Sequence, residues 1–458
     1  MNVYERLNLV IFDSFNIAGD NGEYLYRRIR ELYPDINMTF LISQTCKDFT
    51  RLTNDGFNVV SFESTGIRKI FNEATFILFS KNSGRCQIRP EHRYKSIFLQ
   101  HGVTARIYND SKYLRDIIGR WAKYICCSTK EEMELIDQYT NGKLIPIPTG
   151  FTRHDTLLEK SRRLEESDRA KRIFITFHWR MGECDSIRSV FMHSQYLANV
   201  NKLLNSEYIQ QFAEDGVEIM FFPHARFVKY LSLFNIPKYV KVPTDMVFQD
   251  ILAASDMLIT DFSSNTFEMA YMNKPTLIYI PDLDYVRQKM KHYSVDRIHD
   301  YPHLIYCNTL EDVITHAKDI LYHNPKIDVA QDLFMHVDTN NTKRLVEWMI
   351  ERNKKKAVKV DLAGNDATIQ FVSELFTGNN KPDLVFVNVK SGIFPQGRLS
   401  LPKPLLDYVG RHPCVKISWD DDLVGIDKDE YNVVAMQVPN TYKVDGITKP
   451  QMYSKKFK

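Results

Sequence analysis

Short apolar segments alternate with longer amphipathic segments along most of the chain. The apolar segments have few polar interruptions and are rich in β-branched and aromatic side chains, which is typical of buried parallel strands. A helical pattern separates most of them, beginning with residues 21–32. The alternation predicts a doubly wound α/β domain that ends near residue 150. Its predicted strands are residues 9–15, 38–43, 58–62, 74–80, 96–102 and 123–128.

A second alternating series follows a charged stretch at residues 156–171, which we interpret as a connecting helix or linker. A long helical pattern at 193–214 separates its first two strands, and patterns at 309–322 and 338–353 close it. Two Rossmann-like halves that face each other would leave a cleft between the carboxyl ends of both sheets, where ligands bind. The predicted strands of this half are residues 171–177, 217–224, 257–262, 276–281 and 304–307.

The pattern changes after the segment 352–360, beyond which apolar runs at 383–389, 414–419 and 431–438 could be strands of a third, smaller unit. The sequence therefore predicts three parts. They are a Rossmann-like domain at 1–155, a second one at 156–350, and an appended small α/β domain or fragment at 351–458, to which the sequence assigns no role.

Composition narrows the function classes. The chain has 458 residues, of which 44% are apolar and 26% charged, which is the balance of a folded protein. The net charge of +3 disfavours a general nucleic-acid coat. Seven cysteines without a CxxC pair argue against a disulfide scaffold or a structural zinc site. Because no apolar run approaches the ~20 residues of a membrane span and no signal-peptide pattern is present, we expect a cytoplasmic protein.

The strongest local signal is the segment 258–281, in which a predicted strand ends at Asp261 and a helix should begin at Ser263 and Ser264. Serines at a helix start accept bonds from free N–H groups, and the helix end itself favours an anion. The pattern predicts either a phosphate cradle or a plain helix cap. Asp261 either orients one of these groups or is a turn residue.

Two histidines follow predicted strands. His101 stands at the end of the 96–102 run, Gly102 permits a sharp turn there, and Arg106 follows. His224 ends the 217–224 run, with Arg226 close by. A histidine above a cleft is suited to general-base work near neutral pH. Two of them meeting across a cleft would form a cation pair suited to a pyrophosphate; otherwise each is a buried structural histidine.

Two arginines are candidates for phosphate binding, because guanidinium binds phosphate bidentately. Arg153 lies at the domain junction with Asp155 as its expected partner, and Arg180 follows the first strand of the second half. A salt bridge is the alternative for each. The chain lacks a GxxxxGK[ST] loop, a GxGxxG after the first strand, an HExxH and a DxD-type pair. We therefore expect metal-independent chemistry without a cofactor.

In this order, the motifs resemble those of the CDP-glycerol glycerophosphotransferase family, the teichoic-acid primases and polymerases, over residues 8–350. The segments that carry the resemblance are FDSF with DNGEYLYR, IFLQHGVTAR, TGFTRHD, HWR, ITDFSSNTFEMAYMNKP and VDTNNTKR. Departures from the family pattern include Gly22 and Thr104 in place of proline and Arg106 in place of lysine. They fall mainly in the acceptor-side elements.

The resemblance implies a GT-B-like pair of Rossmann domains. It also implies transfer of a polyol phosphate from CDP-glycerol or CDP-ribitol to a hydroxyl of a lipid-linked or growing polymer, with release of CMP. Such proteins work at the inner membrane face, and Arg352 with Lys354, Lys355 and Lys356 form a basic cluster that anionic lipid could attract. A solvated helix end is the alternative for that cluster.

The resulting mechanism assigns His101 as the base and His224 as the stabiliser of departing CMP. The residues assigned to the donor phosphate and nucleotide are Arg180, Asp261, Ser263, Ser264, Glu268 and Arg153. Those assigned to the acceptor side are Asp13, Gly102 and Arg106. Three alternatives remain: a nucleotide-sugar transferase of the same fold, a non-catalytic polymer-binding protein, and a nucleic-acid binder. Between a capsule and a wall teichoic acid, the lysine-rich chain and its tail favour a capsule or another surface polymer.

Overall fold

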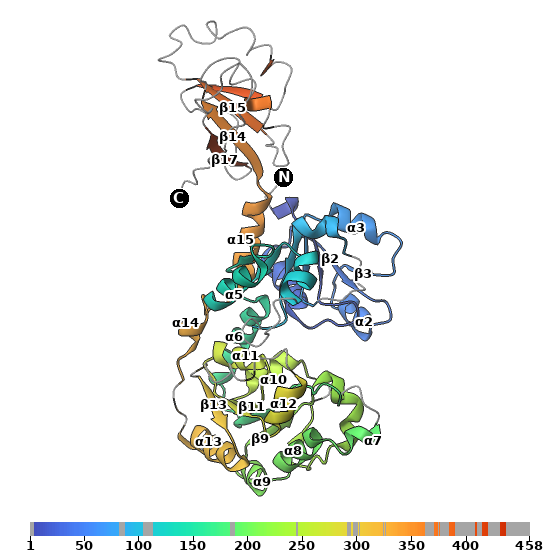
Figure 1. The fold of residues 1–458 in the computed structure, drawn as a ribbon, viewed down its shortest axis with the longest axis vertical. Coiled ribbons are helices and arrows are strands. Elements are labelled where there is room, and N and C mark those ends of the chain that lie inside the picture. Colours follow the sequence, from blue (N-terminus) through green and yellow to red (C-terminus); the bar gives the residue numbers. More distant parts are fainter. Residues whose placement is uncertain are drawn as a thin grey trace. The chain divides into compact units, whose positions relative to one another are not determined.

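Each part of the chain is built around a parallel β-sheet, as the computed structural model shows (Figure 1). Contacts within the chain separate a unit at Tyr4–Val346 from a unit that begins at Glu347, and each is described by itself. The predicted boundary between these parts was after residue 350. The described residues are 4–81, 88–103, 113–183, 188–243, 246–290, 295, 301, 303–323, 325, 327–361, 371–373, 375, 384–389, 408–409, 415–419 and 431–436.

The first half of the Tyr4–Val346 unit holds a parallel sheet in the order β3-β2-β1-β4-β5-β6-β7. Val10 of the central strand β1 pairs with Thr39 on one side and with Ile77 on the other. The strands are β1 (Asn8–Phe12), β2 (Asn37–Ile42), β3 (Val59–Ser61), β4 (Phe76–Phe79), β5 (Ser96–Phe98), β6 (Tyr124–Cys126) and β7 (Ile145–Ile147). The helices and turns are η1 (Tyr4–Arg6), α1 (Asn21–Leu32), α2 (Lys47–Asn54), α3 (Ile67–Glu73), η2 (Pro90–Lys95), η3 (Tyr113–Ile118), α4 (Gly119–Trp121) and α5 (Lys130–Thr140).

The second half repeats this topology in the order β10-β9-β8-β11-β12-β13, again with parallel neighbours. Its strands are β8 (Arg172–Ile175), β9 (Glu218–Phe221), β10 (Val240–Lys241), β11 (Met257–Thr260), β12 (Thr276–Tyr279) and β13 (Leu304–Cys307). Its helices are α6 (Thr152–Glu165), α7 (Arg188–Phe191), α8 (Gln195–Leu204), α9 (Glu207–Glu214), η4 (Ala225–Leu233), α10 (Phe248–Ala254), α11 (Asn265–Tyr271), α12 (Leu283–Lys289), α13 (Leu310–His323), α14 (Ala330–Leu333) and α15 (Asn341–Asn353).

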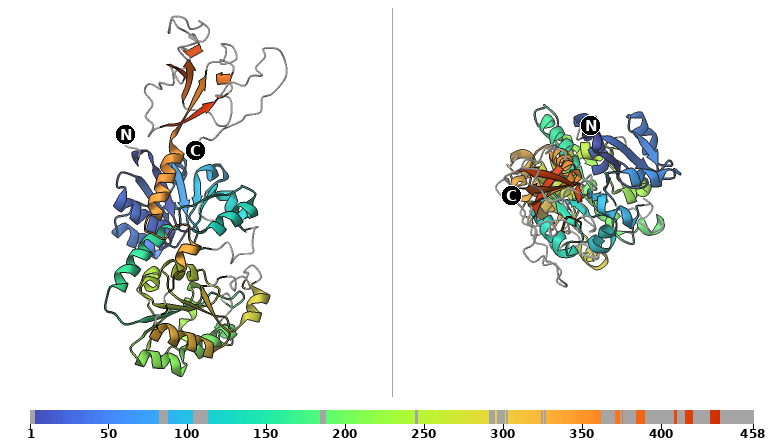
Figure 2. Two further views of the ribbon diagram at one scale, coloured as in Figure 1. Left: turned by 90° about the vertical axis from the view of Figure 1, so that its left-hand side faces the viewer. Right: turned by 90° about the horizontal axis from the view of Figure 1, so that it is seen from above.

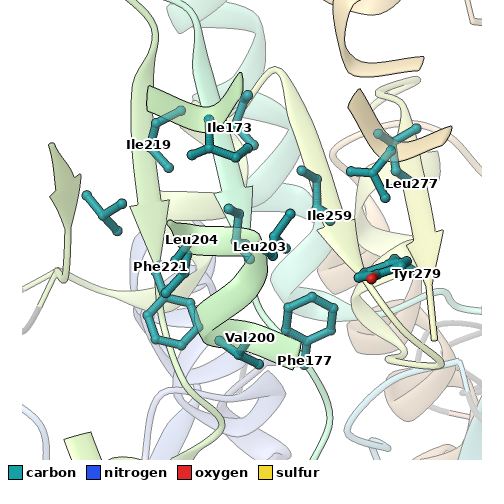
Figure 3. Close-up of a cluster of buried hydrophobic side chains, with 14 of the residues drawn as sticks. Ile173, Phe177, Val200, Leu203, Leu204, Ile219, Phe221, Ile259, Leu277 and Tyr279 are labelled. Carbon is teal, nitrogen blue, oxygen red and sulfur yellow. The ribbon is translucent and has the colours of Figure 1, made fainter. Parts of the chain in front are cut away.

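Alternate residues of each strand in the second sheet pack on opposite faces. Ile173 and Ile175 of β8 belong to one apolar cluster with side chains of α8, α9 and α13 (Figure 3). Phe174, between them, packs on the other face with α10 and α11. Figures 1 and 2 show these two groups of helices on either side of the sheet. The strands are therefore buried on both faces, which explains why their sequences are almost purely apolar.

In the second half, one predicted helix is divided and one strand was missed. The long helical pattern at 193–214 is two helices, because Ser206 caps a new one by accepting a bond from the Ile209 N–H at 3.3 Å. The two-residue strand β10 was not predicted, since it is too short to give a period. The remaining strands lie where apolar runs predicted them.

The unit that begins at Glu347 contains a parallel sheet in the order β16-β15-β14-β17. Its strands are β14 (Lys355–Asp361), β15 (Leu384–Val389), β16 (Val415–Trp419) and β17 (Tyr431–Met436). The last three match predicted strands, and β14 was missed. Lys355 and Lys356 begin β14, so the predicted basic cluster is not simply a helix end.

The strand order places the functional candidates. In each half of the Tyr4–Val346 unit, the crossovers change direction beside the first strand, between β1 and β4 and between β8 and β11. Ligands of open α/β sheets bind at the carboxyl ends of strands at such points. The residues after β1, β5, β8, β9 and β11 include every predicted strand-end candidate. Within the described part of the chain, no helix is both long and apolar enough to cross a membrane.

Candidate active site

Asp13, at the carboxyl end of β1, anchors the start of α1. Its buried carboxylate accepts bonds from the N–H groups of Asp20 (2.9 Å) and Gly22 (2.7 Å) and from the Ser80 hydroxyl (2.7 Å). Burial, with the nearby charge of Asp20, raises the pKa of Asp13 to about 7. The predicted acceptor contact of Asp13 stays a prediction, and its observed role is to fix the loop that carries Asp20.

The loop after β5 is held in a constrained conformation that presents His101. Gln100 has a φ of 63°, in the left-handed region that few residues other than glycine adopt. The Gln100 side-chain amide donates to the Cys126 carbonyl at 2.7 Å. The Gln100 backbone carbonyl accepts a bond from the Asn21 side-chain amide at 2.9 Å. These bonds offset the backbone strain and leave the His101 side chain 59% exposed at the end of the loop.

A chain of ionic contacts leads inward from His101. Its Nδ1 contacts the Asp20 carboxylate, whose other oxygen accepts from Arg153 Nη1 at 2.7 Å. The second Arg153 nitrogen, Nη2, contacts Glu268 of α11. Asp20, Arg153 and Glu268 are all buried. The chain therefore connects the His101 loop of the first sheet to the helix after β11 of the second.

Both carboxylates in this chain are ionised. Burial alone would raise the pKa of Asp20, but its interactions with His101, Lys81 and Arg153 hold it well below its usual range. Lys81 lies 3.2 Å from Asp20 Oδ2. Burial opposes ionisation of Glu268 as well, yet Arg153 and His154 lower its pKa to about 2. The predicted bond from Glu268 to a cytidine ribose stays a prediction.

The two halves also approach each other at Gly102. A Cβ atom at this position would lie 2.7 Å from the Ser264 Oγ and 3.0 Å from the Ser264 Cβ. Gly102 does not have a positive φ, so the reason for glycine is this close approach rather than the sharp turn that we predicted. His101 and the serine pair are consequently brought to one place.

The serines begin α11, but not in the way expected of a helix cap. Ser264 occupies the cap position, and its hydroxyl makes no capping bond. The Ser263 hydroxyl accepts a weak bond from the Asn265 N–H at 3.4 Å. Ser264 is half-buried and Ser263 nearly buried. The plain cap is therefore the wrong interpretation for Ser264, and its contact with a phosphate stays a prediction.

His224, after β9, is close to His101 but does not form a cation pair with it. Burial lowers the pKa of His224 to about 4, helped by its interactions with Arg226, His101 and Lys81. The ring is therefore neutral at pH 7, and the predicted pair of positive imidazoles is wrong for this structure. Since Nδ1 accepts from the Arg226 N–H at 3.2 Å, the ring proton is on Nε2. His224 can donate one hydrogen bond to an oxygen.

Arg180 is a buried brace. Its Nη1 donates to Asp261 at 2.7 Å, while Nε and Nη2 donate to the two oxygens of Asp282 at 2.7 and 2.9 Å. Asp261 also accepts from the His178 N–H at 2.9 Å, which fixes the loop after β8. The prediction that Asp261 orients neighbouring groups fits these contacts. A phosphate contact by Arg180 stays a prediction that would require exchange of a carboxylate.

The structure adds residues that sequence reasoning missed. Three charged residues hold the predicted ones in place: Asp20, Lys81 and Asp282. The ring of His178 packs beside that of His224, with 5.5 Å between the ring centroids. A strand-end position could have indicated Lys81 and Asp282, but nothing in the sequence pairs them. The Arg106 candidate lies outside the described residues. Among the described residues, no group of three or more His, Cys, Asp or Glu could hold a metal ion, and metal independence stays a prediction.

A comparison with family models gives the identity of this arrangement. The model described as CDP-glycerol:poly(glycerophosphate) glycerophosphotransferase matches residues 2–351. The chain belongs to this family. The match covers both Rossmann-like halves and every residue of the candidate site, and it confirms the resemblance noted in the sequence.

The curated relatives that the chain matches are named for teichoic acid synthesis. The chain is 25% identical over 391 residues to the minor teichoic acid biosynthesis protein GgaB of Bacillus subtilis, a match that covers 78% of this chain and 41% of GgaB. It is 45% identical over 62 residues to the teichoic acid glycerol-phosphate primase of the same organism, which covers 14% of this chain and 15% of the primase. The matched segments thus cover less than half the length of either relative.

Solved structures confirm the fold. The wall teichoic acid polymerase TagF superimposes with a TM-score of 0.56 at 18% identity, over 77% of this chain and 91% of that structure. A UDP-N-acetylglucosamine 2-epimerase described as putative, from Listeria monocytogenes, gives a TM-score of 0.50 at 14% identity, over 74% of this chain and 94% of that structure. These superpositions establish a GT-B-like pair of Rossmann domains. At such low sequence identities they establish nothing about the substrate.

Proposed function

We propose that this chain transfers a polyol phosphate from a CDP-polyol to a hydroxyl group of a surface polymer or its lipid-linked precursor, with release of CMP. The acceptor oxygen attacks the phosphorus that bears the polyol and forms a new O–P bond. The bond from that phosphorus to the bridging oxygen breaks, and CMP leaves with the electron pair. The proton of the acceptor hydroxyl passes to His101 Nε2.

The observation that carries the proposal is the close approach of Gly102, next to His101, to Ser264, with His224 near enough to interact electrostatically with His101, in a chain of this family. His101 is the exposed member, as a base that must reach a bulky acceptor has to be. His224 Nε2–H and the Ser264 hydroxyl are donors suited to the oxygens of the departing phosphate. Phosphoryl transfer depends mainly on such positioning and charge stabilisation.

The positive charge needed by a diphosphate would come from side chains other than His224. Arg226 is exposed beside His224, with its guanidinium 4.3 Å from the Trp179 ring centre, and Lys81 lies beside Asp20. We propose that these two cations contact the donor, while Arg153 and Arg180 act from within the protein. Work at the inner membrane face, on a capsule or teichoic acid polymer, belongs to the same proposal.

The test is nucleotide release from a panel of CDP-glycerol, CDP-ribitol and UDP-sugars, each with a polyol-phosphate acceptor. CMP release from a CDP-polyol is expected, and His101→Ala and His224→Ala should each lower turnover by roughly 100-fold or more. His323→Ala, on the exposed face of α13, is the control and should change nothing. Release of UDP would establish a sugar transferase, and release of neither nucleotide would favour a binding protein.

A further inference from the structure

The ionic chain behind His101 has one exposed end and a buried interior. The side chains of Asp20, Arg153 and Glu268 are 4%, 3% and 1% exposed, against 59% for His101. Burial of ions in a protein is costly, and an apolar contact of the same volume usually stabilises as well or better. A buried ionic chain that ends on a candidate base is therefore more readily explained by function than by stability.

The fold has other means of joining the helices that this chain connects. Arg153 is in α6 and Asp20 caps α1, and the Thr152 hydroxyl of α6 already donates to the Asn21 carbonyl at 2.7 Å. On the outer side of the same helix pair, Arg28 pairs with Glu159 at 2.5 Å. The Asp20–Arg153 pair is thus not needed to hold α1 against α6.

The chemistry of the contacts fixes the state of the imidazole. An ionised carboxylate only accepts hydrogen bonds, so the His101 nitrogen that faces Asp20 must be the protonated one. Nδ1 therefore carries a proton, and Nε2 is the nitrogen whose lone pair is free in the neutral ring. A proton taken up on Nε2 would create a cation directly beside the Asp20 carboxylate, which stabilises it.

The far end of the chain reaches the donor side of the candidate site. Glu268 lies one turn into α11, the helix that Ser263 and Ser264 begin, and Arg153 Nη2 is bound to it. Gly102, next to His101, approaches Ser264 directly. The His101 loop and α11 are therefore connected both by packing and through Arg153.

We infer that Asp20 and Arg153 are positioning residues for the transfer reaction, with Asp20 holding His101 in the tautomer that leaves Nε2 free and Arg153 fixing Asp20 against Glu268. This inference rests on the proposed role of His101 as the base. It extends that role by making the competence of the base depend on contact between the two Rossmann-like halves.

The test compares the full-length chain with Asp20→Asn, which keeps a capping oxygen for α1 and so should preserve the fold. The kcat for a CDP-polyol should fall between about 10-fold and the roughly 10⁴-fold loss known for the same change in a Ser-His-Asp triad. The donor Kd from calorimetry should not increase, because Lys81, the proposed donor contact beside Asp20, keeps its charge. Lysine cannot bridge both carboxylates in the geometry of arginine, so the kcat of Arg153→Lys should lie between those of the natural protein and Asp20→Asn.

Glu159→Gln is the matched control, because it removes the outer ion pair between the same two helices and should leave kcat unchanged. An equal loss of kcat in this control would show a general loosening of the α1–α6 pair. Undiminished kcat in Asp20→Asn would overturn the inference.

A second measurement does not depend on turnover. Ring-¹⁵N NMR of His101, assigned by its loss in His101→Gln, should show the Nδ1–H tautomer in the natural protein and a mixture in Asp20→Asn. A predominant Nε2–H tautomer in the natural protein would overturn the inference. If no protein releases CMP while the tautomer result holds, the proposed function fails and the positioning of His101 by Asp20 stands.

Discussion

Replacement of Arg180 by methionine tests whether this residue is a structural brace. The guanidinium is 2% exposed, and its bonds run to Asp261, Asp282 and the carbonyl of His178. Methionine fills similar space but leaves both carboxylates, each at most 3% exposed, without their cation. Removing one partner of a buried ion pair costs about 3–5 kcal/mol, because the remaining charge is buried and uncompensated.

The cost should depend on pH. Burial already raises the pKa of Asp261 above the ordinary value of 3.8, and the charge of Arg180 works against this increase. Without Arg180 the pKa of Asp261 should rise further, so its ionisation destabilises the fold progressively as pH increases above 3.8. The loss of stability in Arg180→Met should therefore be larger at pH 8 than at pH 5.5, where protonation removes part of the buried charge.

The assay is urea unfolding of the full-length variants at both pH values, followed by circular dichroism. Arg172→Met is the matched control, because Arg172 stands at the other end of β8 in a partly exposed pair with Glu218 at 2.5 Å. Pairs of this kind contribute at most about 1 kcal/mol. A loss in Arg180→Met no greater than in Arg172→Met, combined with weaker donor binding, would refute the brace and favour the predicted phosphate contact.

Three other predictions concern single positions. Gly102→Ala should lower kcat roughly 10-fold, since its Cβ would lie 2.7 Å from the Ser264 Oγ and 3.0 Å from the Ser264 Cβ; an unchanged kcat would contradict the close approach. Gly150→Ala should lower the free energy of unfolding in urea by about 1–3 kcal/mol, because φ is +76° and the new Cβ would overlap the Asn341 Oδ1; an unchanged free energy would contradict the packing. Burial raises the pKa of Glu183 from 4.5 to about 7, so the protein should lose stability between these pH values, and Glu183→Gln should flatten that part of the stability profile.

The strands could be predicted because their burial on both faces leaves a direct mark in the sequence. β13 (Leu304–Cys307), for example, coincides with the predicted run at 304–307. The break between α8 and α9 was missed because the apolar period continues across it, although Ser206 carried the signal of a new cap. β14 was missed because its three lysines mask the apolar residues between them.

The candidate site was predictable as far as strand ends could show it. His101, His224 and Ser264 lie where the parallel sheets bring together residues far apart in sequence. The ionic contacts behind them could not be predicted from the sequence. Arg153 contacts Asp20, which is 133 residues away in the sequence, and Glu268, which is 115 residues away. We interpreted a charged residue at a strand end as a ligand contact. In the structure such a side chain is buried away from solvent, and it then requires a charged partner within the protein.

The most direct test is a crystal structure of the full-length chain with a bound CDP-polyol. The account predicts that the diphosphate lies between His101 and His224, with Ser264 within hydrogen-bond distance of a phosphate oxygen. A carrier bound in another part of the chain, away from all three residues, would contradict it.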